Sequence, residues 1–514
     1  MASFDLTTEP WIPVERADGS SEEVSLRTVL SEAHSIDEVY GDSPLQTMAL
    51  YRLLQALAIC IDGAVPSGRA EWIIRYEQEG RFEAEQIHSY FDLWQDEREC
   101  FDLFHSERPF YQHLEPLTNQ VKSVANLFAG RASGNNATLF DHALDEEPDP
   151  ATPSEAARGL VATQAAALAG GKSKPFYYKN APLASGAVFW LRGNNLFEAL
   201  LLNTPPTSEA RMVSGTRPSW ERAWDHGGLP EPEVRPEDGY LDYLTWPSRR
   251  ILLGTDTDEN GNVVVNQMQI SQGDARENGE RDPLMAFNYS SQAGVYPVRI
   301  QKDRALWRDA NALMQVFSEE TGGAPRTVQW VSAHLPEARW WTDVFGMSTD
   351  QSKIEKWRHL RMPIYPSILG SDVRQHSLQE ALEHAERQAG SLRRAAREYA
   401  AYLQYNCGYD DLDLDNERRD ARDLARSSGA LQRYWSRLED PFFGWIEDLA
   451  AAEDDIDLLQ AEWTKKAYVT ANRAYEKALG TLGETAKHMR ARAEGKGYVR
   501  PAASFADVLE GQPE

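Results

Sequence analysis

Two acidic stretches of the sequence have residue types that could coordinate a hard cation. "DTDENGN", Asp256–Asn262, imitates the start of a calcium-binding loop, but its twelfth position holds Gln267 where a bidentate glutamate is required. Its flanks have strand character, so we expect a β-hairpin with Asn260–Gly261 at the tip. "YDDLDLDNERRD", Tyr409–Asp420, lacks a tight-turn glycine, which favours a solvated linker and a helix N-terminus. We therefore expect no metal and no cofactor.

The sequence contains no recognisable catalytic constellation. Asp225 and His226 are adjacent in "WDHGG", but no HExxH accompanies them, and there is no GxSxG nucleophile motif. The 15 tryptophans and the many carboxylates would suit a carbohydrate hydrolase, whose two carboxylates stand roughly 5–9 Å apart, but no pair stands out. We expect a protein that is not an enzyme, and a soluble hydrolase remains an alternative.

The stretch "ALAGGKSKPFYYKN", Ala167–Asn180, combines adjacent glycines with lysines and aromatic residues. It is not a Walker loop, because GxxxxGK[ST] would need a glycine where Ala166 stands. Gly170 and Gly171 allow the backbone to come close to another molecule, and lysines interleaved with aromatic rings suit a nucleic-acid surface. A tight turn after a helix is the alternative interpretation.

The stretch "STDQSKIEKWRHLRM", Ser348–Met362, carries a glutamine followed by positive charge. Its Ser, Thr and Asp residues could cap a helix whose first turn Glu355 closes, so the pattern predicts a helix start. One interpretation is a solvated helix face. The other places Gln351 at an exposed tip, able to enter a groove or lodge between base pairs, with cations such as Lys353 behind it to hold phosphate.

The charge of the whole chain limits the classes of function. The 514 residues carry a formal net charge of −27, which weighs against a free-standing nucleic-acid binder but not against a subunit with basic neighbours. The N-terminus has no secretion-signal pattern, and no stretch reaches the ~18–20 apolar residues of a membrane helix. The three cysteines form no CxxC pair. We expect a cytoplasmic protein that has no membrane partner.

Hydrophobic periodicity divides the chain into two parts. In the first part, short strand and helix patterns alternate, including a buried helix at Leu45–Ala64 and a strand followed by a helix at 186–203. In the second, apolar positions recur at three and four, beginning with a long amphipathic helix at Ser377–Asn406. The expected fold class is α+β, with a mixed α/β domain over 1–366 and an all-α, four-helix bundle over 367–514.

Several motifs together resemble a known family. They recur in the order and with the spacing typical of that family, although no single one is diagnostic. They are "LTTEPWIPV" (Leu6–Val14), "HSERPFYQ" (His105–Gln112), "LFAG...NNATLF" (Leu127–Phe140), "LRGNNLFEALLLN" (Leu191–Asn203) and "RPSW" (Arg217–Trp220). The chain resembles the CasA family, the large subunit of the type I-E CRISPR Cascade surveillance complex. The similarity extends over residues 1–370 and continues more loosely into the helical part.

The resemblance implies a non-catalytic subunit of an RNA-guided antiviral complex, placed at the 5′ end of the guide RNA. Members of the family recognise the protospacer-adjacent motif of duplex DNA from the minor groove, start unwinding, and present a platform for a helicase-nuclease. We therefore expect guide RNA, the other Cascade subunits, double-stranded target DNA and the helicase-nuclease as partners. A purely structural scaffold in the same assembly, without base contacts, is an alternative.

The resemblance also implies positions that read the motif. Gln351 matches the place of a glutamine wedge. "AGGK", which comprises Ala169, Gly170, Gly171 and Lys172, matches a glycine-rich loop that contacts the minor groove. The family's lysine finger has no counterpart, because Asn266 or Gln267 falls near its place. Some members carry cysteine pairs in that hairpin, and their absence here predicts no zinc.

Two further regions carry expectations of binding. Phe140 and the acidic, proline-rich stretch up to Gly159 match a loop that docks near the 5′ end of the guide, and we expect a long loop there that orders on assembly. Arg393, Arg394 and Arg397 could line a path for the displaced strand, because helical spacing places 393 and 397 on one face. An ordinary solvated helix face is the alternative for these arginines.

Overall fold

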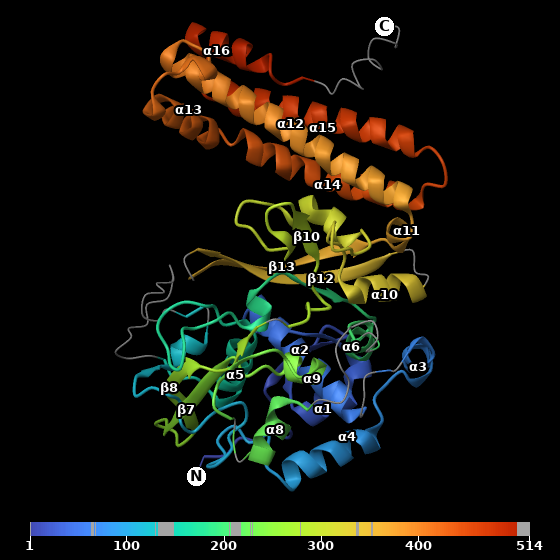
Figure 1. Cartoon of the computed structure of the whole chain (residues 1–514), viewed down its shortest axis with the longest axis vertical. Helices are drawn as coiled ribbons and strands as arrows, with labels where there is room; N and C mark the ends of the chain where they lie inside the picture. The colour runs from blue at the N-terminus through green and yellow to red at the C-terminus, as the bar shows by residue number, and fades with distance from the viewer. Residues whose placement is uncertain are drawn as a thin grey trace. The chain divides into compact units, whose positions relative to one another are not determined.

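The computed structural model divides the chain into two compact units (Figure 1). One unit comprises Met1–Arg304 and Val316–Ile364, and the other comprises Ala305–Gln315 and Tyr365–Glu514. The residues that the structure describes are 2–62, 66, 68–128, 130–131, 149–204, 206, 217–226, 228, 230–277, 279–335, 339–350 and 353–500. Helices and sheets are mixed in the first unit and a helical region follows, which confirms the α+β fold class.

The first unit is organised around helix α2 (Pro44–Ile61), which confirms the predicted buried helix. The side chain of Ser43 caps it by accepting a hydrogen bond from the Gln46 N–H, and nearly every residue of the helix is buried. The expectation that no stretch reaches the length of a membrane helix is wrong for α2: within the described ranges it is the one helix long and apolar enough to cross a membrane, and 89% of that stretch is buried inside the fold. Such burial is typical of a core helix.

Strand β5 (Val188–Leu191) leads into helix α6 (Leu196–Leu202), as the sequence predicts. The strand belongs to an antiparallel sheet of order β13-β12-β5, in which β12 (Trp340–Asp350) is the central strand and β13 (Lys353–Ile364) is an edge strand. The sheet is thus built from segments far apart in the sequence.

The expectation of a helix start at Ser348–Met362 is wrong, because this segment contributes to β12 and β13. The two strands pair in an antiparallel ladder that ends with Asp350 opposite Lys353. Strand pairing is favoured over a helix because both strands contain aromatic and β-branched residues that pack well on a half-buried sheet. Phe345 and Trp357 are examples. The residues suited to capping a helix lie instead at the end of a strand.

The predicted hairpin with Asn260–Gly261 at its tip is confirmed. Strand β7 (Arg249–Thr257) pairs with β8 (Val263–Gln272), and β4 (Val121–Ser123) pairs with the other edge of β8. Gly261 has a φ of +86°, a left-handed conformation that suits glycine at the turn.

The expected loop at Phe140–Gly159 is in part wrong. Residues 132–148 lie outside the described residues, but helix α5 (Pro153–Ala166) already begins within the predicted loop. Thr152 and Glu155 form a reciprocal capping box, with the Thr152 N–H 2.8 Å from the Glu155 carboxylate. Acidic residues and proline were misleading here, because they favour the first turn of a helix as well as loops.

The remaining described α-helices and β-strands of the first unit each span from 2 to 9 residues. They are β1 (Ile12–Arg16), β2 (Ser21–Val24), α1 (Leu26–Ser31), β3 (Ile36–Val39), α3 (Arg69–Ile74), α4 (Ala84–Phe91), α8 (Ser219–His226), β6 (Val234–Arg235), α9 (Tyr240–Leu244), β9 (Ala275–Arg276), β10 (Phe287–Ser290), β11 (Gly294–Pro297) and α10 (Arg326–His334). Strands β1, β2 and β3 form a sheet of order β2-β1-β3 near the N-terminus.

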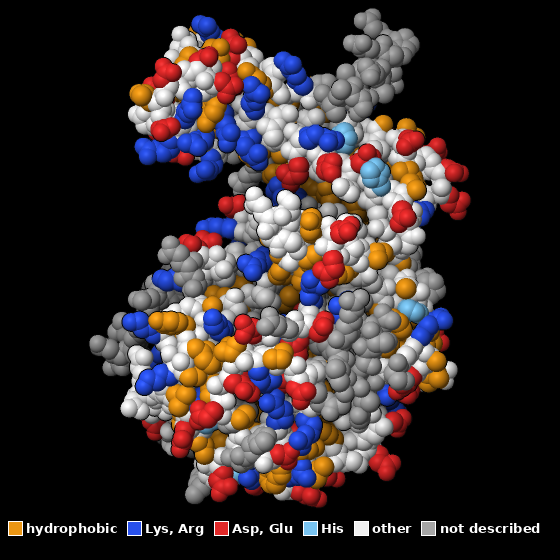
Figure 2. Space-filling model, viewed as in Figure 1, with side chains coloured by type: hydrophobic (Ala, Val, Ile, Leu, Met, Phe, Trp, Pro, Cys, Tyr) orange, Lys and Arg blue, Asp and Glu red, His pale blue; other side chains and the backbone are white. Residues whose placement is uncertain are grey.

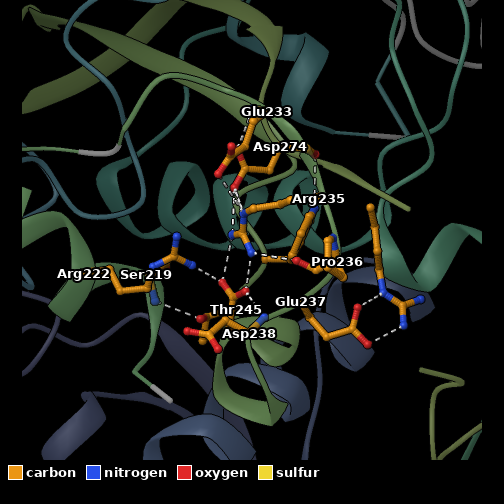
Figure 3. Close-up of polar contacts among 12 residues, drawn as sticks. Ser219, Arg222, Glu233, Arg235, Pro236, Glu237, Asp238, Thr245 and Asp274 are labelled. Carbon is orange, nitrogen blue, oxygen red and sulfur yellow. Dashed lines mark hydrogen bonds and ion pairs between the residues drawn. The ribbon is translucent and has the colours of Figure 1, made fainter. Parts of the chain in front are cut away.

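An ion network ties α8, α9 and the parallel pair β6–β9 together (Figure 3). Asp242 on α9 is fully buried and contacts both Arg222 and Arg235. Arg235 also lies 2.8 Å from a carboxylate oxygen of Asp274. Because each buried charge has an opposite partner, the network stabilises this region only while it stays complete.

Two of the motifs that carry the family resemblance build an aromatic core in the first unit. Phe110 of "HSERPFYQ" and Trp220 of "RPSW" pack with ring centroids 5.9 Å apart, and both lie near Phe101. The Trp220 indole donates a hydrogen bond to the Tyr90 hydroxyl at 2.9 Å. The aromatic residues of these motifs therefore help to hold the fold together.

The second unit is a helical bundle. Its helices are α11 (Pro366–Leu369), α12 (Asp372–Tyr405), α13 (Asp415–Ser427), α14 (Ala430–Ala451), α15 (Ile456–Gly480) and α16 (Ala486–Lys496), and α12 packs against each of the four that follow it. The segment Ala305–Gln315 belongs here because Trp307 stacks on Phe442 at 4.6 Å and Arg308 donates to Glu386 at 2.9 Å. Nothing in the sequence pattern indicated that this early segment would join the bundle.

Candidate nucleic-acid interface

A groove in the first unit brings the glycine loop and the start of strand β13 together. Its volume is about 730 Å³, and both Gly170 and Lys353 line it. Aromatic rings of Phe128, Tyr178 and Trp357 contribute apolar surface to the same groove. The interior is large enough for a nucleotide-sized group, since ligand pockets typically measure about 300–1,000 Å³.

The charged residues that line the groove are mostly basic. They are Lys122, Arg131, Arg249 and Lys353, against one carboxylate, Asp42. Part of this charge is internally balanced, because Arg131 lies 2.9 Å from Glu155. In a chain of net charge −27 the groove is a local region of the opposite sign, which favours phosphate.

The glycine loop follows the C-terminus of α5 and presents its backbone to solvent. Gly170 and Gly171 have φ values of +120° and +80°, and both are exposed, as is Lys172. The Ala169 N–H donates to the side chain of Asn180 at 2.7 Å, which closes the loop across its base. The bare, left-handed backbone at two successive glycines allows a close approach that any larger residue would hinder.

The loop is fastened to the β7–β8 hairpin by buried polar groups. The Gln272 side chain accepts a hydrogen bond from the Lys179 N–H at 2.7 Å, and the Tyr178 hydroxyl donates to the Ile270 carbonyl at 2.9 Å. The Arg249 guanidinium donates to two loop carbonyls. Burial lowers the pKa of Arg249 to about 10, a value that still leaves it charged at neutral pH.

Gln351 lies outside the described residues, so the predicted wedge itself stays a prediction. The residues that flank it in sequence are described: Asp350 pairs with Lys353 at the end of the β12–β13 ladder, and both are exposed. Lys353 lines the groove that contains Gly170. Gly170 itself and Lys353, which lies two positions after residue 351, therefore line the same groove.

A buried carboxylate clamps strand β12 to strand β13. Asp343 is 2% exposed and lies 2.9 Å from Arg361, 3.0 Å from Arg192 and 3.0 Å from His359. Burial alone would raise the pKa of Asp343, but the hydrogen bonds from His359 and Arg361 and the charge of Arg192 lower it to about 2. The carboxylate is therefore ionised at neutral pH and holds the edge strand in place.

Asn266 and Gln267 are placed on β8 but do not line the groove. Asn266 sits at a β-bulge where the register shifts, and its amide donates to Asp256 at 3.1 Å. Gln267 is exposed, and its side chain lies against Gly254. The same sheet reaches the groove through Lys122 and Ile270 instead. Lys122 was missed because a lone lysine in a short strand carries no sequence signal.

The other predicted positions are distributed differently. Phe140 lies outside the described residues, although Phe128 and Arg131, which precede the undescribed segment, line the groove. In the second unit, Arg393 and Arg394 are exposed on α12, and Arg397 is partly buried with its guanidinium 5.7 Å from the Tyr409 ring. Arg394 pairs with Asp410 at 3.2 Å, so part of its charge is balanced.

Further arginines gather on the neighbouring helices α13 and α14. Those that are exposed include Arg419, Arg422, Arg426, Arg433 and Arg437. Figure 2 shows basic side chains concentrated over this part of the bundle. They were not predicted because acidic residues are interleaved with them in the sequence, as in "DNERRDARD", so that no run of positive charge stands out.

The described residues contain no group of three or more His, Cys, Asp or Glu side chains able to hold a metal ion. The groove itself presents a single carboxylate, Asp42, rather than a pair. Its arrangement suits recognition of a polyanion, because it combines cations, aromatic rings and a bare backbone.

Comparison with known proteins gives a consistent result. The model of the family described as CRISPR-associated protein Cse1 matches residues 5–474. The CRISPR-associated protein CasA/Cse1 of Thermus thermophilus is 29% identical over 514 residues, with 96% of each chain covered. The crystal structure of Cse1 from Acidimicrobium ferrooxidans matches with a TM-score of 0.79 at 25% identity, covering 100% of both chains.

A chain of a solved CRISPR RNA-guided surveillance complex shares the fold. It matches with a TM-score of 0.74 at 23% identity and covers 97% of this chain and 100% of that chain. The family resemblance in the sequence motifs is therefore confirmed, and the chain belongs to the family of the CRISPR-associated protein Cse1, also called CasA.

Proposed function

We propose that this protein is a non-catalytic subunit of a cytoplasmic, RNA-guided Cascade complex and recognises a short motif in duplex DNA from the minor groove. Its partners would be guide RNA, the other subunits of the complex, target DNA and a helicase-nuclease recruited after target binding. Family membership supports the assembly. The groove shared by Gly170 and Lys353 supports the DNA contact, and it is the single observation that carries the proposal.

The chemistry of the groove fits reading from the minor groove. That side of DNA mainly distinguishes A·T from G·C, through acceptors and the guanine amino group. A bare glycine backbone at 170–171 can approach it closely, and the amide of Gln351 can both donate and accept. Cations such as Lys122 and Lys353 would hold the flanking phosphates and fix the register without reading sequence.

The proposed role of Gln351 is to wedge into the duplex below the motif. Separating a base step costs a few kcal/mol, and contacts to the opened DNA must offset this cost. Because strand exchange into an RNA–DNA hybrid is near balance, a small local wedge can decide where unwinding begins. The acidic surroundings would discourage binding elsewhere along the DNA.

The test is target unwinding by the reconstituted complex with Gln351→Ala, read by fluorescence of a 2-aminopurine placed next to the motif. We expect normal assembly and a loss of unwinding. Gln379→Ala, an exposed glutamine on α12, is the matched control and should behave as wild type. Full unwinding by the Gln351→Ala complex would favour a structural scaffold without base contacts.

A further inference from the structure

The two ends of the glycine loop meet at one guanidinium group. The Nη2 atom of Arg249 lies 2.9 Å from the Leu168 carbonyl oxygen and 2.8 Å from the Lys179 carbonyl oxygen, so a single nitrogen bridges both ends. We infer that Arg249 is the positioning residue of the glycine loop: it sets the place of Gly170 and Gly171 at the groove. The effect of this residue on DNA, but not its effect on the loop, rests on the proposed function.

An arginine is required at this position for geometric reasons. Arg249 is 2% exposed, and its Nη1 atom donates to the Ser248 carbonyl at 2.8 Å while Nη2 makes the two bonds to the loop. The guanidinium serves the Ser248 carbonyl from one nitrogen and the two loop carbonyls from the other, whereas a lysine has one nitrogen, on a stem one bond shorter, to serve all three. The acceptors in these contacts are neutral carbonyls, so the positive charge is not cancelled by them.

The position of Arg249 is itself fixed from the opposite side. The Gln164 side chain on α5 accepts from the Arg249 N–H at 2.8 Å and donates to the Arg249 carbonyl at 2.8 Å. Helix α5, strand β7 and the loop are thus linked through one residue. Arg249 also lines the groove, so its buried charge adds to the positive field there.

The decisive experiment is hydrogen exchange of the intact chain with Arg249→Lys, which keeps the charge but loses the fork. The amides of Ala169 and Gly170 are hydrogen-bonded within the loop and that of Lys179 to the Gln272 side chain, and we expect all three to exchange at least about tenfold faster. Amides of α2 should be unchanged. Unaltered exchange in the loop would overturn the inference.

Arg158→Lys is the matched control, because Arg158 is also buried and donates to a backbone carbonyl, that of Trp11 at 2.8 Å. It should leave the loop amides protected. If Arg249→Lys instead lowers the melting temperature far more than Arg158→Lys and raises exchange throughout the first unit, Arg249 is a general core residue and the inference is wrong.

The assembled complex separates this inference from the proposed function. In a motif-library binding assay we expect Arg249→Lys to reduce discrimination between motifs about tenfold, with Arg158→Lys unchanged. A loosened loop together with full motif discrimination would leave Arg249 as the positioning residue but would contradict the role of the loop in reading DNA.

Discussion

Gly170 and Lys353 line the same groove, although one follows helix α5 and the other begins strand β13. Helix α2 explains how the fold achieves this, because it packs against both α5 and β13. Its residues Leu45 and Gln46 also line the groove. The long buried helix α2 is thus the common support of the two segments for which we propose DNA contacts.

The first prediction concerns Gly171. Its φ of +80° would cost a residue with a Cβ atom about 1–2 kcal/mol, although the added atom would lie 3.7 Å from Tyr178 without a clash. We therefore expect Gly171→Ala to shift the loop and weaken binding of the complex to target duplex by about tenfold, measured by equilibrium titration.

Gly19→Ala separates backbone strain from a local effect. Gly19 has a φ of +81° and open space where a Cβ atom would lie, and it belongs to the turn between β1 and β2. The two variants should lose similar stability in urea, but only Gly171→Ala should lose DNA binding. Equal binding losses in both would mean that general destabilisation, not the loop, is responsible.

The sequence was sufficient to predict elements whose signal is local. Helix α2 is apolar on nearly every face, and the Asn260–Gly261 pair predicts the turn of the β7–β8 hairpin. The prediction for the segment after Ser348 failed because capping residues and strand-forming residues compete there, and the pairing of β12 with β13 decides between them.

The candidate site could be predicted only where it depends on unusual residues. The paired glycines at 170–171 are conspicuous, but Arg249 is one arginine in "PSRRILL", and its role exists only because Leu168 and Lys179 are folded against it. Trp357 and Lys122 likewise reach the groove through strand register, which a single sequence does not specify.

The second prediction concerns the basic face of the bundle. Arg393 and Arg394 are exposed on α12, so replacing both by glutamate should weaken binding of the displaced single strand by the complex. The slope of log K against log salt is negative, and its magnitude should decrease by about 0.7 for each phosphate that the variant no longer neutralises, measured by fluorescence anisotropy between low and moderate salt.

Arg387→Glu is the control for this pair, because Arg387 is exposed on the same helix and lies 3.7 Å from Glu383. It changes the net charge of the helix in the same direction without touching the 393–394 positions. An equal reduction in slope for this variant would indicate a nonspecific field effect and would argue against a defined path for the strand.

The third prediction concerns the ion network around Asp242. Asn at this position keeps the shape of the side chain but leaves Arg222 and Arg235 without their shared buried carboxylate. Breaking such a network typically costs about 3–5 kcal/mol, so Asp242→Asn should lower the free energy of unfolding by that amount in urea. Asp238→Asn, an exposed neighbour, should be nearly neutral, and comparable losses in the two variants would contradict this account.

The fourth prediction is a pH dependence that arises from Asp343. The folded-state pKa of its carboxyl is lowered from 3.8 to about 2, against the opposing effect of burial, by His359, Arg361 and Arg192. A group with a depressed folded pKa adds stability above its unfolded pKa and loses it as the pH falls through the folded value. The shift corresponds to about 2 kcal/mol, present at pH 7 and lost between about pH 4 and pH 2.

Asp343→Asn tests this relationship directly. The variant should unfold more easily than the wild type at pH 7, and the difference in the free energy of unfolding that is due to ionisation should shrink as the pH falls below about 4. Asp350→Asn, at the exposed end of the same strand, serves as the control. A stability difference for Asp343→Asn that stays constant from about pH 7 to pH 2 would show that the carboxylate acts by packing and not by its charge, and the clamp on strand β13 would then not be electrostatic.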